Sequence, residues 1–283
     1  MIEPMIRKVL WDGDHYSLAL FSDLHLGAND SEEDKLRKDL EQSCNENRRI
    51  LINGDVVEAI LSTDMKRFTP SKILSGRDDA LNEITEYAVN FLKPYADYID
   101  LIGTGNHEQS TIRYNSFDII GAICVLLNRE RSKSLEPIHR AGYQGYAQYR
   151  INDGNNKLTS VFTIYHHHGI GGSSPVSKGM IDFNRIIYSH DADLWWIGHK
   201  HVGTHDPYII RDGLSRMGLY ERKIGQAVFT PGYKKAVNVD KDGYNIYYSD
   251  QFYSMQACGY AAVNLFRDGH TQRLKERYEV ISR

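Results

Sequence analysis

Five short polar motifs occur in order along the chain, and most of them directly follow an apolar stretch with the character of a β-strand. They are Asp23-Leu24-His25, Gly54-Asp55, Gly105-Asn106-His107-Glu108, His166-His167-His168-Gly169 and Gly198-His199-Lys200-His201. Together they offer the carboxylates, amide oxygen and imidazoles that divalent metal ions bind. Because open α/β sheets build their sites at the carboxyl ends of strands, we expect the fold to bring these motifs together.

The first half of the chain alternates between strand-like and helix-like segments. The pattern predicts strands over 16–22, 49–53 and 98–103, and helices over 31–47, 78–92 and 115–127. Ser31 and Asp34 have the spacing of a capping box for the first helix. Residues 60–76 are irregular and are expected to form a loop beside the site.

The second half is richer in alternating, strand-like segments. A hairpin is expected from 144–151 and 157–165 across Asp153-Gly154, and another from 260–266 and 272–281 about Asp268-Gly269. Residues 180–188 read as a short helix and 194–197 as a strand. The predicted fold class is α/β (α+β), with two stacked mixed β-sheets forming a sandwich flanked by helices. We expect one domain over 1–283, with its motif-bearing core at about 17–203 and a β-rich completion at about 204–283.

Composition limits the class of protein and the cellular compartment that we expect. Its 283 residues are 41% hydrophobic and 25% charged, an ordinary globular profile. No apolar run is long enough for a signal peptide or a membrane span, and the three widely spaced cysteines favour a reducing compartment. The prediction is a cytoplasmic protein with no membrane partner, and its oligomeric state stays open.

Charge and aromatic content leave the question of nucleic acid open. The net charge of -3 provides no global basic field, although a local groove would not need one. The 19 tyrosines are explained either as half-buried strand positions or as a stacking surface for bases.

The motif residues have the properties that a two-metal site requires. Asp23 and His25, like His199 and His201, are two positions apart and would share one face of an extended segment. The carboxylate of Asp55 can bridge two cations. Paired ions roughly 3.5–4 Å apart generate hydroxide near neutral pH and clamp phosphoryl oxygens. The expected cofactor is therefore two divalent metal ions.

His107 is expected to project from its loop away from the metals. A protonated imidazole there would protonate a leaving oxygen, which contributes on the order of 10²–10⁴-fold to a rate. The alternative is a structural loop histidine. Glu108 is expected to contact the His107 imidazole and hold it in its charged state.

The ordered motifs resemble the calcineurin-like metallophosphoesterase superfamily over about residues 17–203. The resemblance implies a β-sandwich flanked by helices and a di-metal site, here most often Mn²⁺, with Fe, Zn²⁺ or Mg²⁺ as alternatives. It also implies one metal on Asp23, His25, Asp55 and His201, and a second on Asp55, Asn106, His168 and His199. His107 matches the family's general acid. His168 is assigned because it precedes glycine, and His166 or His167 would serve if the strand register differed.

Two departures from the protein phosphatases indicate a branch within that superfamily. Those enzymes carry arginines after the acidic residue of the second motif and before the third motif. Here Ala59 follows Glu58, and Thr104 precedes Gly105. The resemblance therefore implies the phosphodiesterase and nuclease branch, of the small phage or bacterial type, with a preference for diesters or pyrophosphates over monoesters.

The expected function is a phosphodiesterase in which a metal-bridging hydroxide attacks the phosphorus of a nucleic acid or nucleotide diester. A pyrophosphatase acting on a nucleotide-linked substrate and a non-catalytic, metal-stabilised binding subunit are the alternatives. Arg113 and Lys178 are expected to touch substrate phosphate. A solvated loop or an ion pair with Glu108 would equally explain Arg113, and a flexible connection would explain the loop that carries Lys178.

Overall fold

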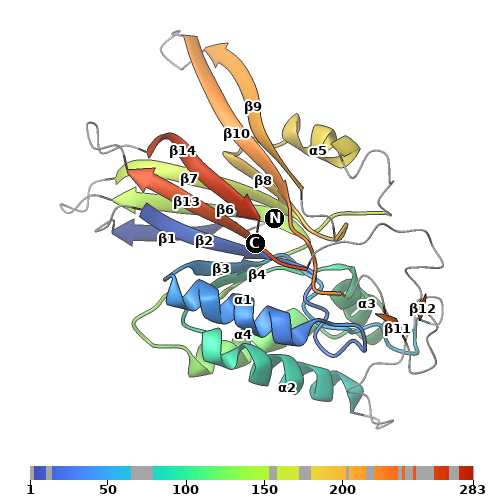
Figure 1. Ribbon diagram of the computed structural model, residues 1–283. Helices are drawn as coiled ribbons and strands as arrows, with labels where there is room; N and C mark the ends of the chain where they lie inside the picture. The colour runs from blue at the N-terminus through green and yellow to red at the C-terminus, as the bar shows by residue number, and fades with distance from the viewer. Residues whose placement is uncertain are drawn as a thin grey trace.

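The fold is a sandwich of two six-stranded mixed sheets with helices on both outer faces (Figure 1). The computed structural model describes residues 3–10, 15–64, 79–152, 158–171, 180–201, 204–214, 220–234, 238–239, 245–246, 258–267 and 274–282. The predicted fold class is confirmed. The two hairpin turns at Asp153-Gly154 and Asp268-Gly269, and most of the expected loop over 60–76, lie outside these residues.

The first sheet contains both strands of the central hairpin. Its order is β1 (Met5–Leu10), β6 (Gln144–Asn152), β7 (Leu158–His167), β8 (Leu194–Ile197), β10 (Tyr220–Phe229) and β9 (Thr204–Leu214). β7, β8 and β10 run parallel, so their carboxyl ends lie at one edge. β1 was not expected from the sequence.

The second sheet joins the two ends of the chain. Its order is β14 (Leu274–Ser282), β13 (Ala261–Arg267), β2 (His15–Phe21), β3 (Arg49–Ile52), β4 (Ile99–Ile102) and β5 (His139–Arg140). β13 pairs antiparallel with β2, so the β-rich C-terminal segment extends the sheet that the N-terminal motifs use. A separate short ladder joins β11 (Asn238–Val239) to β12 (Asn245–Ile246).

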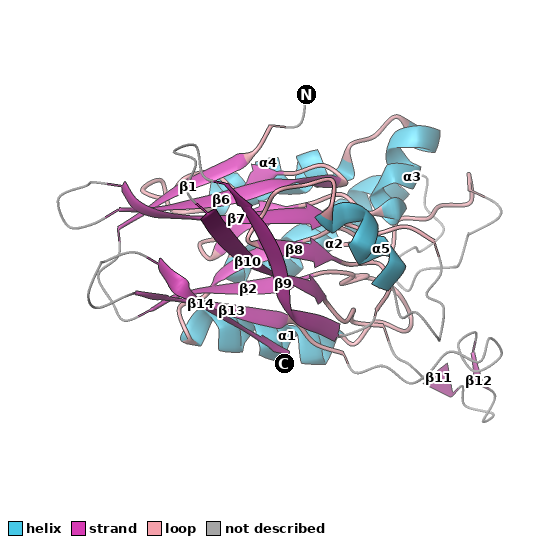
Figure 2. Ribbon diagram, turned by 90° about the horizontal axis from the view of Figure 1, so that it is seen from above, coloured by secondary structure: helices cyan, strands magenta, loops and turns pink. Residues whose placement is uncertain are grey.

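The helices divide between the two outer faces. Those of the second sheet are α1 (Glu33–Asn45), α2 (Ala80–Leu92) and α4 (Ile119–Glu130), and α5 (Met180–Ile187) covers the first sheet (Figures 1 and 2). A 3₁₀ turn, η1 (Lys93–Tyr95), follows α2, and α3 (Asn106–Asn115) follows β4. No helix among the described residues is long and apolar enough to cross a bilayer.

Successive side chains of a strand point to opposite faces of the sheet, so they pack alternately against the other sheet and against the helices. In β2, Leu18 and Leu20 face the core between the sheets, whereas Ala19 and Phe21 face the helices. In β8, Trp196 faces the inter-sheet core and Trp195 packs against α5. β8 is buried throughout, and β2 is buried from Ser17 to Phe21, as expected for strands covered on both faces.

Three local expectations are corrected by the structure. α1 begins at Glu33 after the N-cap Glu32, so the predicted capping box is wrong, and the Ser31 hydroxyl donates to the carbonyl of Leu24 instead. The third motif opens helix α3 rather than a loop. Tyr233 and Tyr260 are fully buried and stack on Phe21, so these two tyrosines belong to the core.

Candidate metal centre

The loops that follow β2 and β3 run side by side and carry the first two motifs. The Asp23 amide donates to the Gly54 carbonyl at 3.0 Å, and the His25 amide donates to the Asp55 carbonyl at 2.9 Å. Asp23, His25 and Asp55 have φ values of 54°, 46° and 47°. The segment is therefore not the extended strand that was expected, yet the left-handed turns direct all three buried side chains to one site.

The third motif begins a helix that faces Asp55. The backbone amide of His107, in the first turn of α3, donates to Asp55 Oδ1 at 2.9 Å. The positive end of the helix dipole favours a carboxylate at this place. A Cβ on Gly105 would lie 2.2 Å from Asp55 Oδ1, so only glycine permits this approach.

The fully buried Glu108 carboxylate joins the second and third motifs. It accepts hydrogen bonds from the amides of Gly105, Asp55 and Val57 at 2.7, 3.1 and 3.1 Å. The prediction that Glu108 holds the His107 imidazole is wrong. Neighbouring residues of a helix point about 100° apart, so the two side chains diverge.

One oxygen of Asp55 faces histidines from three motifs. Asp55 Oδ2 lies 3.2 Å from His168 Nε2, 3.8 Å from His25 Nε2 and 3.9 Å from His107 Nε2. Burial alone would raise the pKa of Asp55, but the neighbouring imidazoles, His168 first, lower it well below its usual range. The carboxylate is therefore ionised and available as a ligand.

Two groups of possible metal ligands share Asp23. One contains Asp23, His25 and His201, and the other contains Asp23, Asp55, His168 and His199. Asn106 Oδ1 lies 3.3 Å from His168 Nε2 and joins the second group. The structure thus brings together all seven residues predicted as ligands, namely Asp23, His25, Asp55, Asn106, His168, His199 and His201.

Of the histidine triplet, only His168 points into this cluster. The Nδ1 atom of His168 bonds to the Asn53 carbonyl at 2.8 Å, which leaves Nε2 to face Asp55. His166 is buried beside the Asn53 side chain, with 3.3 Å between His166 Nδ1 and Asn53 Oδ1. His167 turns to the other side of the strand and lines a pocket.

The fifth motif is anchored by Asp23. The His199 amide donates to both carboxylate oxygens of Asp23, at 2.8 and 3.0 Å. His199 and His201 have φ values of 66° and 50°, so they do not share a face of an extended strand as expected. Lys200 points away from the histidines, and its Nζ donates to the carbonyls of Ile170 and Gly171.

The donor set fits divalent cations. Both ring nitrogens of His25 are buried; Nδ1 lies 3.4 Å from Glu58 Oε2, and Nε2 has no hydrogen-bond partner among the described residues. Burial lowers the pKa of His25 and of His201 to about 3, so both rings are neutral at pH 7 and can donate a lone pair. Imidazole, carboxylate and amide oxygen together suit Mn²⁺, Fe and Zn²⁺.

His107 is held by Glu58, a residue whose role the sequence did not reveal. His107 Nδ1 lies 2.8 Å from Glu58 Oε1, and Lys234 Nζ lies 3.1 Å from Glu58 Oε2. Burial opposes the charge on His107, but the carboxylates of Asp55 and Glu58 outweigh it and raise the pKa of this imidazole. His107 is therefore set up as a proton donor.

The segment that directly follows β10 also contributes to the site, through residues that no motif marks. The Tyr233 amide donates to the Asp23 carbonyl at 2.9 Å, which places the neighbouring Lys234 beside Glu58. A Cβ on Gly232 would lie 2.3 Å from His201 Nδ1. The only sequence signal for Glu58 was its spacing three residues after Asp55.

The two predicted substrate contacts have different outcomes. Arg113 is exposed on α3, and its guanidinium lies over the ring of Tyr114, 5.8 Å from the centroid. The alternative of an ion pair with Glu108 does not hold, because the Glu108 oxygens accept backbone amides. Lys178 lies outside the described residues.

Comparisons with known proteins found similarity among solved structures. No protein-family model matches the chain. No curated protein matches it either. Similar solved structures include a metallophosphoesterase from Sphaerobacter thermophilus (13% identity, 95% of this chain and 88% of that one, TM-score 0.36). Others are the calcineurin-like phosphoesterase YfkN from Bacillus subtilis (11%, 95% and 90%, 0.38) and GAP50, the anchor in the inner membrane complex of Plasmodium (8%, 95% and 89%, 0.43).

At these identities and TM-scores the similar structures carry no argument about activity. The geometry itself defines the class: a sandwich of two mixed sheets with a buried candidate centre for divalent metals at the ends of its strands. The five motifs on which the resemblance to the calcineurin-like metallophosphoesterases rests meet there.

Proposed function

We propose that this protein is a divalent-metal-dependent phosphoesterase that hydrolyses phosphodiester bonds in nucleic acid or in a nucleotide diester. One observation carries the proposal: Asp55 Oδ2 lies 3.2–3.9 Å from imidazole nitrogens of His25, His107 and His168, which come from three separate motifs. Two divalent ions, when bound, supply hydroxide near neutral pH and neutralise the charge of phosphoryl oxygens. Mn²⁺ is the ion that we propose, and Fe, Zn²⁺ or Mg²⁺ fit the same donors.

His107 supplies the proton for the leaving oxygen. Glu58 holds its Nδ1 atom at 2.8 Å, and its Nε2 atom is on the side of Asp55, where the ligands gather. The raised pKa of His107 favours the protonated form of this imidazole. A positioned acid of this kind contributes on the order of 10²–10⁴-fold to the rate.

The charges beside the motifs favour a diester over a monoester. A phosphomonoester dianion needs additional cations, and Ala59 and Thr104 stand where phosphatases have arginines. The lysines placed beside the motifs are engaged with carboxylates: Lys200 lies 3.1 Å from Asp182, and Lys234 lies 3.1 Å from Glu58. A diester carries a single negative charge, which the metal ions can balance.

The test is Mn²⁺-dependent hydrolysis of bis(p-nitrophenyl) phosphate and of p-nitrophenyl phosphate. We expect diester turnover that requires the metal and falls by at least about 100-fold in Asp55→Asn and in His107→Asn. Asp34→Asn, which changes an exposed carboxylate on α1, is the matched control and should keep the parent rate. A preference for the monoester would contradict the proposal, as would metal binding without turnover of either ester.

A further inference from the structure

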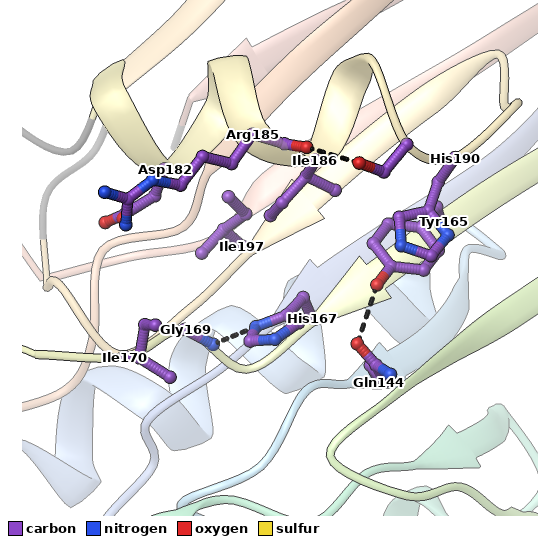
Figure 3. A pocket seen from close by; sticks show the side chains of 11 residues that line it. Gln144, Tyr165, His167, Gly169, Ile170, Asp182, Arg185, Ile186, His190 and Ile197 are labelled. Atoms are coloured by element: carbon purple, nitrogen blue, oxygen red, sulfur yellow. Dashed lines mark hydrogen bonds and ion pairs between the residues drawn. The ribbon is translucent and has the colours of Figure 1, made fainter.

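A pocket of about 210 Å³ includes His167 and Gly169 in its lining, the two residues that flank the candidate ligand His168 (Figure 3). It is an open pocket lined by the start of β6, the ends of β7 and β8, and helix α5. We propose that this pocket binds a nucleobase, the planar heteroaromatic ring system of a nucleotide substrate whose phosphate lies at the metals. The inference rests on the proposed function and narrows its substrate class.

The pocket and the metal centre share their backbone. His167 and His168 are neighbours at the end of β7, and they point to opposite sides, His167 into the pocket and His168 toward Asp55. Gly169 lines the pocket, and a Cβ at this position would lie 2.8 Å from the Cβ of His199. The pocket and the ligand cluster are therefore neighbours at the end of β7, and the proposal is that one substrate occupies both, with its phosphate at the cluster and its ring system in the pocket.

The pocket has mostly apolar walls. Ile170, Ile186 and Ile197 line the pocket. The rings of Tyr165 and His190 stack at one end of it, with 3.9 Å between their centroids and 13° between their planes (Figure 3). Drug-sized ligands occupy sites of about 300–1,000 Å³. A cavity of about 210 Å³ therefore takes one ring system rather than a whole nucleotide.

A few polar groups face this apolar space and match the edge of a base. Gln144 Oε1 accepts the Tyr165 hydroxyl at 2.8 Å, so the Gln144 amide nitrogen keeps its donors for a ligand. His167 Nδ1 accepts the Gly169 amide at 2.8 Å, which puts the proton of the neutral ring on Nε2. Asp182 adds acceptor oxygens. Donors and acceptors on apolar walls are the pattern of a site that orients a heteroaromatic ring.

Lys200 links the pocket to the loop that carries His199 and His201. It belongs to the fifth motif, and its Nζ bonds to the Ile170 carbonyl at 2.5 Å and lies 3.1 Å from Asp182 on α5. One buried side chain thus joins two walls of the pocket to the loop that carries His199 and His201. The pocket is held in place before a ligand arrives, which lowers the cost of binding.

The first test measures binding without phosphate, metal or turnover. Adenosine, guanosine, cytidine and uridine are titrated into the metal-free protein by calorimetry. We expect at least one nucleoside to bind and its affinity to fall at least tenfold in Ile186→Trp, which fills the pocket from α5. Asn184→Trp, on an exposed position of the same helix, is the matched control and should bind as the parent does. Ile170→Trp, at a position that is 55% exposed, repeats the test if Ile186→Trp does not fold.

The second test separates the pocket from the reaction. Turnover of a nucleoside 5′-(p-nitrophenyl phosphate) is compared with that of methyl p-nitrophenyl phosphate. We expect Ile186→Trp to lower the preference for the nucleoside ester at least tenfold, through KM. Diester turnover with no nucleoside binding and no such preference would overturn the pocket but leave the proposed function standing. Nucleoside binding with no turnover of any ester would overturn the proposed function but not the pocket.

Discussion

Glu58 Oε1 lies 2.8 Å from His107 Nδ1, and this contact links the second motif to the expected proton donor. The other oxygen of Glu58 lies 3.1 Å from Lys234 Nζ and 3.4 Å from His25 Nδ1. One side chain, 5% exposed, therefore touches the acid, a candidate ligand and a cation from the C-terminal segment. We expect it to position His107 and to help keep that imidazole charged.

Replacing Glu58 by Gln should change the pH profile of hydrolysis. Burial opposes the charge on His107, and Asp55 and Glu58 raise its pKa, so removing one carboxylate lowers that pKa. The acid then loses its proton at a lower pH, and the basic limb of the kcat profile moves to lower pH. We expect a loss of about 10–100-fold at pH 8. An unchanged basic limb would show that Glu58 has a structural role only.

Replacing Lys234 by Gln should move the same limb in the opposite direction. The Lys234 cation lowers the pKa of His107, so its removal lets His107 stay protonated to a higher pH. The measurement is the kcat profile from pH 6 to pH 10, beside that of Glu58→Gln. Shifts of equal sign in the two variants would contradict this electrostatic explanation.

Asp100 should stabilise the fold without taking part in the site. It is 2% exposed and lies 2.5 Å from Arg49 and 3.5 Å from Arg131, and it accepts the Tyr149 hydroxyl at 3.1 Å. Asp100→Asn leaves buried guanidinium groups without their carboxylate, which costs about 3–5 kcal/mol of unfolding free energy. Urea unfolding measures the loss.

The control for Asp100→Asn is a variant that removes an exposed ion pair. Glu130→Gln removes the contact between Glu130 and Lys93 at 2.8 Å, where both side chains are about half exposed. This variant should lose far less unfolding free energy than Asp100→Asn, because water screens an exposed ion pair. Equal losses in the two variants would contradict the importance of burial at Asp100.

His166 should make the metal-free protein less stable in mild acid. Burial lowers the pKa of His166 from 6.5 to about 3 in the folded state. The folded state therefore favours the neutral ring, and the stability that His166 contributes is present above pH 6.5 and lost as the pH falls from 6.5 toward 3. Between pH 7 and pH 5.5 this loss is about 1 kcal/mol.

The measurement is urea unfolding of the parent and of His166→Gln at both pH values. From pH 7 to pH 5.5, the unfolding free energy of the parent should fall by about 1 kcal/mol more than that of His166→Gln. A difference that does not depend on pH would contradict the lowered pKa.

Metal ions should stabilise the folded protein through the Asp55 cluster. A ligand that binds only the folded state adds about 2.7 kcal/mol when its concentration is 100 times its Kd. We expect Mn²⁺ to raise the melting temperature and EDTA to reverse the rise. Asp55→Asn should abolish most of the effect, whereas Asp34→Asn should keep it. A rise of the same size in Asp55→Asn would place the ions elsewhere.

Much of the architecture could be read from local pattern. The apolar run of 194–197 predicted β8, and the hairpin signal predicted β6 and β7, because alternation and turn residues act over a few neighbouring positions. β1 was missed because its apolar and charged residues do not alternate along the sequence: the apolar Ile6 and Leu10 are exposed, and Arg7 and Lys8 interrupt the apolar run. α3 was missed because its polar residues have little helical periodicity.

The sequence by itself determined which ligand types the protein has, their order, and the strands that carry them. Only the tertiary structure decided which of neighbouring polar residues does which task. Asn53 selects His168 from the triplet, and Glu58 takes the place beside His107 that was expected for Glu108. Lys234 reaches the site only because β10 ends beside β8. Side-chain direction depends on whether a strand is followed by a helix or a left-handed turn, and on contacts between segments far apart in the chain, which short-range pattern does not encode.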